Sequence, residues 1–106
     1  IISVYDMKKE VYNDKYIKVP SDVECDVTKT CLASDYINNN MYMVCDKKFH
    51  YYSFETNTWT KGKNLNYNHS ASICGTANNR FYVFSGKSTA IIEYVTISEN
   101  LRNNEF

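Results

Sequence analysis

The sequence predicts an all-β protein of the β-propeller type, and three observations lead to this fold class. Tyr, Phe and Trp make up 15% of the 106 residues, and aromatic side chains favour strands over helices. No segment shows the sustained i, i+3, i+4, i+7 apolar stripe of an amphipathic helix. Short apolar segments alternate with polar turns, and two landmarks repeat at intervals of about 40 residues, as in propeller blades of about four strands each.

The N-terminal third predicts two short strands and a loop, followed by a buried strand. Residues 2–6 alternate as a strand, and residues 11–19 resume extended structure until Pro20. Because Pro lacks a backbone donor, this position fits a strand exit better than a central strand. Residues 23–29 are polar and predict a loop, whereas residues 30–37 are mostly small and apolar, as expected of a crowded, buried strand.

The rest of the chain predicts six further strands separated by turns. They cover residues 41–45, 49–54, 58–61, 70–76, 81–85 and 90–96. The chain has only three Gly and one Pro, so Asn and Asp must supply most of the turns. Asn tolerates the left-handed backbone conformation at modest cost, and the asparagines at 38–40 and 78–79 predict two of these turns.

Self-comparison of the chain gives the two repeating landmarks. A tyrosine is followed seven residues later by another large side chain in Tyr5 and Tyr12, Tyr52 and Trp59, and Tyr94 and Leu101. These tyrosines recur after 47 and then 42 residues. The second landmark aligns residues 39–46 with residues 79–86, 40 residues apart, and so matches Tyr42 with Tyr82. Two independent landmarks in one period predict repeated blades.

These motifs resemble the kelch repeat. Residues 81–86 (Phe-Tyr-Val-Phe-Ser-Gly) match its Tyr-Val-x-Gly-Gly strand, with Ser85 in place of one glycine. Residues 52–59, which end in Glu-Thr-Asn-Thr-Trp, are very close to the family's usual hairpin. The resemblance covers nearly the whole chain and is strongest in residues 41–94. The Asn-, Tyr- and Lys-rich, glycine-poor sequence is similar to the kelch-like proteins of poxviruses.

The sequence departs from the kelch pattern in four further places. Cys45-Asp46 replaces the diglycine of the earlier repeat, and the family's arginine is missing near residues 67–69. Tyr12 and Leu101 stand where the family usually has Trp.

The resemblance implies a partial kelch-type β-propeller of about two four-stranded antiparallel blades, with the kelch region spanning residues 1–106. Residues 1–19 would supply the outer strands of one blade, residues 29–62 one full blade, and residues 69–106 most of the next. Because propellers close with four to eight blades, we expect a fragment of a longer protein. The residues expected to be structural are Tyr5, Tyr12, Tyr42, Tyr52, Trp59, Tyr82, Gly86 and Tyr94. We expect Trp59 to pack between sheets, as large aromatics do.

Charge and motifs exclude several classes of function. Lys plus Arg and Asp plus Glu each number 12, so the chain has no net charge. Because no excess of positive charge attracts the phosphate backbone, we expect no nucleic acid partner. No apolar run approaches the ~20 residues that span a bilayer, so we expect no membrane partner. His50 and His69 lie at no metal-ligand spacing to the cysteines and lack a nucleophile elbow, so we expect no metal, no cofactor and no enzyme activity. We expect His50 to be exposed.

The four cysteines, at 25, 31, 45 and 74, leave two alternatives open. An even count permits two disulfides in a secreted protein. However, Cys45 and Cys74 lie in apolar strand patterns, where a free thiol packs as a small hydrophobe. Reduced thiols and a cytoplasmic location, the host cytoplasm for a viral protein, are therefore the expectation.

The resemblance implies a non-enzymatic protein–protein interaction module with a protein partner of unknown identity. In BTB-kelch proteins such a module selects substrates for a cullin-3 ubiquitin ligase, which binds the BTB domain. No BTB segment occurs here, so any link to cullin-3 would be indirect. The loops of one face predict Tyr67, His69, Lys47, Lys48 and Lys87 as partner contacts. Two alternatives are a non-functional fragment of a truncated kelch gene and the propeller part of a galactose-oxidase-like copper enzyme.

Overall fold

The computed structural model describes residues 2, 5–6, 11–12, 16–23, 25, 27–86 and 89–106. In this part of the chain the strands are β1 (Tyr5–Asp6), β2 (Val11–Tyr12), β3 (Thr30–Asp35), β4 (Asn40–Cys45), β5 (Lys48–Ser53), β6 (Thr58–Lys61), β7 (Ile73–Ala77), β8 (Arg80–Gly86) and β9 (Thr89–Thr96). Two short 3-10 helices, η1 (Val27–Lys29) and η2 (Leu101–Asn103), complete the elements.

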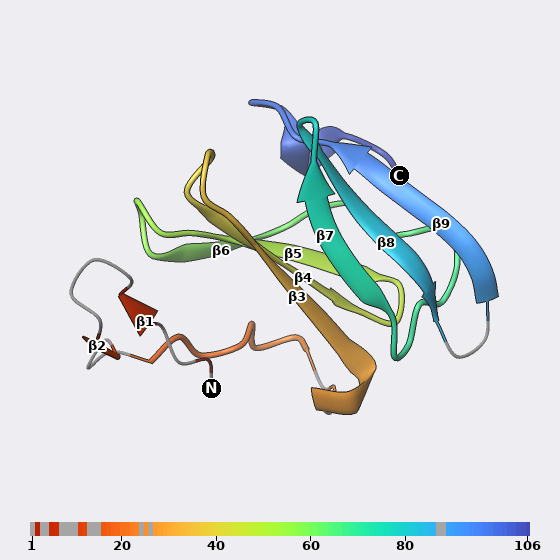
Figure 1. The fold of residues 1–106 in the computed structure, drawn as a ribbon, viewed down its shortest axis with the longest axis horizontal. Coiled ribbons are helices and arrows are strands. Elements are labelled where there is room, and N and C mark those ends of the chain that lie inside the picture. Colours follow the sequence, from red (N-terminus) through yellow and green to blue (C-terminus); the bar gives the residue numbers. More distant parts are fainter. Residues whose placement is uncertain are drawn as a thin grey trace.

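The strands form three antiparallel sheets in which each strand pairs with its neighbour in sequence. These are the pair β1-β2, the four-stranded sheet β3-β4-β5-β6 and the three-stranded sheet β7-β8-β9. Figure 1 shows the two larger sheets as separate layers, with the N-terminal segment beside the first of them. The all-β prediction is confirmed, and the successive antiparallel sheets are consistent with a fragment of a β-propeller.

The seven-residue spacing of large side chains corresponds to cross-strand pairs in two of its three copies. Tyr52 on β5 lies directly opposite Trp59 on β6, and Tyr5 on β1 lies opposite Tyr12 on β2. In the third copy Leu101 lies in η2 and not in a fourth strand. Its side chain is buried in the core, so the chain end closes over the core there.

Asparagine supplies the tight turns, as the composition predicts. Positive φ angles occur at Asn39, Asn57, Asn78 and Asn79. Gly86 has a φ of +148°, and a Cβ there would lie 2.9 Å from the Cα of His69. This position therefore requires glycine, both for its backbone conformation and for the close approach of the neighbouring loop.

The main core lies between the two larger sheets. Tyr42, Val44 and Phe49 of the first sheet and Phe81, Val83 and Val95 of the second belong to one buried cluster. The ring centroids of Tyr42 and Phe81 lie 5.1 Å apart. Large aromatic rings at this separation contribute packing energy beyond their buried area, so this cluster holds the sheets together.

A second cluster covers the opposite face of the β3–β6 sheet. Ile17 of the N-terminal segment packs there with Met41 and Tyr52. Trp59 also packs against this cluster, with its ring centroid 5.2 Å from that of Tyr52. Its indole N–H donates to the backbone carbonyl of Lys18 at 2.7 Å, so Trp59 anchors the N-terminal segment on the sheet.

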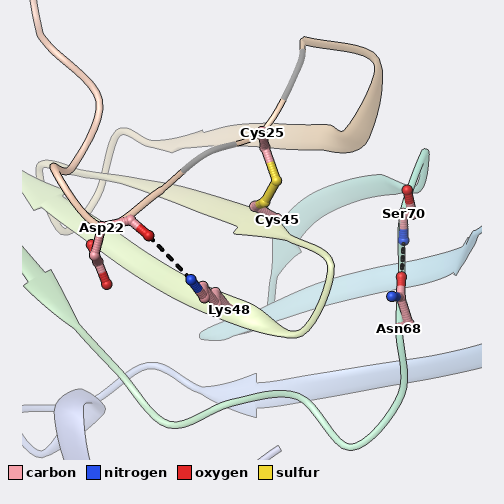
Figure 2. The surroundings of a disulfide bond; sticks show 6 residues. All are labelled: Asp22, Cys25, Cys45, Lys48, Asn68 and Ser70. Carbon is pink, nitrogen blue, oxygen red and sulfur yellow. Dashed lines mark hydrogen bonds between the residues drawn. A yellow bond between two sulfur atoms is a disulfide. The ribbon is translucent and has the colours of Figure 1, made fainter.

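A disulfide also ties the N-terminal segment to this sheet. Cys25 is bonded to Cys45 at the end of β4, as Figure 2 shows. The expectation of four reduced thiols is therefore wrong for this pair. Cys25 lies over the face of the sheet to which the Cys45 side chain points, and this brings the two sulfurs together. Cys31 and Cys74 are free.

Candidate interaction surfaces

One face of the three-stranded sheet is apolar and exposed. Ile73 lies opposite Phe84, which lies opposite Ile92, and in the next row Tyr82 lies opposite Tyr94. Because directly opposed residues point to the same side of a sheet, these five side chains share one face, which we call the outer face. Ile73 is 74% exposed and Ile92 is 58% exposed.

Alternation along the strands produces this face. The side chains of Phe81 and Val83 point inward to the core and are fully buried, whereas that of Phe84, the next residue on β8, points outward and is 40% exposed. The guanidinium of Arg80 lies over the ring of Tyr94, 4.5 Å from its centroid, a favourable cation–π geometry. The outer face therefore has an apolar centre with a cation at its rim.

The equivalent face of the four-stranded sheet is covered. In the alignment of the two repeats, Tyr42 and Val44 of β4 correspond to Tyr82 and Phe84 of β8. Tyr42 and Val44 are completely buried, because the inner face of the β7–β9 sheet packs on them. Tyr42 and Val44 thus lie against a second sheet, whereas their counterparts Tyr82 and Phe84 lie on the exposed outer face.

The loops predicted to bind a partner meet at one end of the sheets. The backbone N–H of Leu65 donates to the carbonyl of Lys47 at 2.8 Å, and the N–H of His69 donates to the carbonyl of Asp46 at 3.0 Å. The side chains of Lys47 and Tyr67 are exposed. The structure therefore joins the loop at residues 62–69 to the β4–β5 turn, and both side chains point to solvent.

The other three predicted contact residues differ from this pair. Lys48 is half-buried, and its ammonium donates to the carbonyl of Asp22 at 3.1 Å (Figure 2). Lys87 lies outside the described residues. His69 was expected to be exposed, and this is wrong because its side chain is completely buried.

His69 is buried because it pairs with Glu93 of β9. Its Nε2 lies 2.6 Å from a carboxylate oxygen of Glu93, and its Nδ1 hydrogen-bonds the carbonyl of Ser85. A carbonyl and an ionised carboxylate only accept hydrogen bonds, so the imidazole ring of His69 is held between two acceptors. We call His69, Glu93 and the loop residues Asn66 and Tyr67 the Glu93 clamp.

The Glu93 carboxylate is fully satisfied within this clamp. Its oxygens accept from the backbone N–H of Asn66 at 2.8 Å and of Tyr67 at 3.0 Å. The side-chain amide of Asn66 donates at 2.9 Å. Burial alone would raise the pKa of Glu93, but these hydrogen bonds and the one from His69 together lower it below its ordinary value. The clamp therefore fixes the loop at residues 62–69 to the second sheet.

The expectation of an exposed His50 is also wrong. This residue is 2% exposed, and its Nε2 donates to a carboxylate oxygen of Asp22 at 3.0 Å. The ammonium of Lys61 lies 3.8 Å from the other oxygen. These residues line a surface cleft of about 420 Å³ together with Lys18 and Trp59. The N-terminal segment forms one wall of this cleft, which is why β5 alone gave no sign that His50 is covered.

The two titratable groups of this cleft, His50 and Asp22, interact with each other. Burial lowers the pKa of His50, and the neighbouring Asp22 offsets part of this shift. The neutral ring therefore carries its proton on Nε2, where Asp22 accepts it. Among the described residues, one grouping has metal-ligand dimensions, formed by Cys25, Cys45 and Asp46. The disulfide between the two sulfurs removes the thiolates that a metal would need.

Sequence reasoning missed the outer face, although the sequence carries a signal for it. Residues 81–84 are all apolar, and a continuous apolar run is typical of a strand that is covered on both faces. The structure covers only the inner one. The apolar residues 81–84 therefore indicated that a second element covers the outer face of this strand. The described residues do not supply such an element.

A scan against protein-family models gave no match, and a search of curated proteins found none that is similar to this chain. No helix in the described part of the chain is long and apolar enough to cross a membrane.

Proposed function

We propose that this chain is a non-enzymatic protein–protein interaction module of a kelch-like β-propeller, and that its outer face packs against a β-sheet of the partner. The observation that carries the proposal is the contiguous apolar patch of Ile73, Tyr82, Phe84, Ile92 and Tyr94 on one sheet face. Soluble proteins rarely expose apolar patches of this kind unless they bind another protein there.

The chain itself supports a β-sheet as the occupant. Tyr42 and Val44, the counterparts of Tyr82 and Phe84, are buried beneath the inner face of the β7–β9 sheet. That covering face presents Val83 and Val95, together with Phe81. A partner sheet with a similar aliphatic face would cover the outer face in the same way, at the spacing of about 10 Å that packed sheets adopt.

The narrower identity of the module depends on its sequence motifs. The hairpin at residues 52–59 and the strand at residues 81–86 resemble the kelch repeats of poxvirus proteins. In such a protein the module would recognise host proteins in the cytoplasm and, where a BTB domain is joined to it, present them to a cullin-3 ubiquitin ligase.

The outer face can be tested by self-association, because a second copy of the chain offers the same apolar sheet. Sedimentation velocity over a range of protein concentrations should show reversible association of the wild-type chain. The double variant Phe84→Lys with Ile92→Lys should remain monomeric, because two charges at the centre of the face would have to be desolvated.

A matched control uses two apolar residues outside the face. Tyr36 and Ile37 in the β3–β4 turn are 97% and 88% exposed, and the variant Tyr36→Lys with Ile37→Lys should associate as the wild type does. Association that the outer-face variant leaves unchanged would contradict the proposal. A wild-type chain that stays monomeric at all concentrations would show that a second copy of the chain does not supply the partner sheet.

A further inference from the structure

The two free cysteines meet between the sheets. Cys31 lies on β3 and Cys74 on β7, and these strands contact each other across the interface between the two sheets. Cys31 is buried in the main core, and Cys74 packs against the same cluster at its half-buried margin. Their side chains are hydrogen-bonded to each other. Two thiols from different repeats are thus held in direct contact.

The hydrogen bond makes the two sulfurs unequal. It lowers the pKa of Cys31, against the opposing effect of burial. The same hydrogen bond and burial raise the pKa of Cys74. Of the two thiols, Cys31 is therefore the one that ionises more readily. The thiolate is the nucleophilic form of cysteine, so the pair combines an attacking sulfur with an adjacent second thiol.

We propose that Cys31 and Cys74 form an oxidation site that closes to a disulfide between the two sheets when it reacts with hydrogen peroxide. The Cys31 thiolate attacks one peroxide oxygen, so that an S–O bond forms, the O–O bond breaks and hydroxide leaves. The Cys74 sulfur then attacks the Cys31 sulfur, the S–S bond forms, and the sulfenic oxygen leaves as water. Two thiols and one peroxide thereby yield one disulfide and two water molecules.

The existing disulfide is separate from this pair. Cys31 lies opposite Val44 on β4, and successive side chains on a strand point to opposite faces. Cys45 therefore points to the face that the N-terminal segment covers, where it bonds Cys25. The sheet separates the two pairs, so thiol–disulfide exchange between them is blocked in the folded protein.

The site can be tested on the whole chain with the Cys25–Cys45 disulfide intact. The chain is titrated with hydrogen peroxide, quenched with a maleimide under denaturing conditions, and mapped by mass spectrometry without reduction. The two free thiols should disappear together, and a cross-linked peptide containing Cys31 and Cys74 should appear with the loss of two hydrogens.

Two single variants separate the roles of the sulfurs. With Cys74→Ser, Cys31 should stop at the sulfenic acid, which dimedone traps. With Cys31→Ser, Cys74 should react far more slowly than in the wild-type chain. The mass-spectrometric result for the wild-type chain remains a test of the proposal even if neither variant folds. Independent loss of the two thiols, cross-links from either of them to Cys25 or Cys45, or no loss at peroxide levels that oxidise free cysteine would each overturn the proposal.

Discussion

The two larger sheets use equivalent strands in different surroundings. In β4 the five residues from Met41 to Cys45 are all buried, because the N-terminal segment covers one face and the second sheet covers the other. In β8 the buried residues alternate with exposed or half-buried ones. The comparison teaches that the repeated sequence determines where a strand forms. How deeply its side chains are buried depends on which segments pack against each face of the sheet.

The tyrosines at the aligned position show the difference in detail. Tyr42 is completely buried, and its hydroxyl donates to Asp35 at 2.6 Å. The same carboxylate accepts from the backbone N–H groups of Ile37 and Asn38, so Tyr42 helps to order the β3–β4 turn. Tyr82 lies half-buried on the outer face. One residue type thus organises a turn in the first sheet and offers a surface in the second.

The largest expected effect separates the two faces of β8. Phe81→Ala should reduce the free energy of unfolding by about 3–5 kcal/mol, because it opens a cavity between the sheets. Phe84→Ala should reduce it by about 1 kcal/mol or less, because its side chain is already partly in water. Urea denaturation of both variants measures the difference. Equal losses would show that the outer face is covered within the chain itself.

The Glu93 clamp exists only in the second sheet and its loop. Glu93→Gln should cost about 1.5–3 kcal/mol, the range for hydrogen bonds to charged groups, because the N–H groups of His69, Asn66 and Tyr67 lose their ionised acceptor. Glu55→Gln in an exposed turn is the matched control and should leave stability unchanged. If both variants unfold at the same urea concentration, the clamp contributes nothing to stability.

The clamp also predicts a pH dependence. The folded pKa of Glu93 lies below its ordinary value of 4.5, so its contribution is fully present above that pH. The contribution is lost as the pH falls through the folded pKa. Subtracting the stability curve of Glu93→Gln from that of the wild type isolates this group from other carboxylates. A difference that stays constant between about pH 6 and about pH 3 would contradict the lowered pKa.

A smaller effect is expected at the buried tyrosine. Tyr42→Phe should cost about 1 kcal/mol, since Asp35 keeps its other hydrogen bonds and the ring still fills its place. Tyr82→Phe on the outer face should change stability by no more than about 0.5 kcal/mol. Thermal unfolding of the pair checks the contrast, and a larger loss for Tyr82→Phe would reverse the comparison between the sheets.

The sequence predicts local structure well where the relevant residues are close along the chain. The hairpin from Tyr52 to Trp59 is found as predicted, because its turn and its strand alternation are both local. His69 was misjudged because its polar loop resembles an exposed one. Its partner Glu93 lies on a strand 24 residues away. The disulfide was missed for the same reason, since nothing local to Cys25 predicts where the loop folds.

Register is the other feature that the repeat does not determine. Met41 lies opposite Tyr52 in the first sheet, so the aligned repeats predict Phe81 opposite Tyr94. The structure pairs Tyr82 with Tyr94, with a register shift between Phe84 and Gly86 further along the hairpin. A slip of one residue moves side chains to the other face. Tyr94 is therefore exposed on the outer face, whereas its counterpart in the repeat is buried.

The smallest effect is expected at the covered face of the first sheet, where His50 faces Asp22, Lys48 and Lys61. Because burial holds the pKa of His50 below its ordinary value of 6.5, the folded state favours the neutral ring. Its contribution to stability is therefore present above that pH and is lost as the pH falls below it. His50→Gln should flatten the stability curve between about pH 7 and about pH 5. Asp22→Asn should steepen it, because removing the carboxylate lowers the folded pKa further. Wild-type stability that rises on acidification through this range would mean that the attraction between protonated His50 and Asp22 outweighs the effect of burial. The N-terminal segment would then cover its face of the first sheet less completely than the second sheet covers the opposite face.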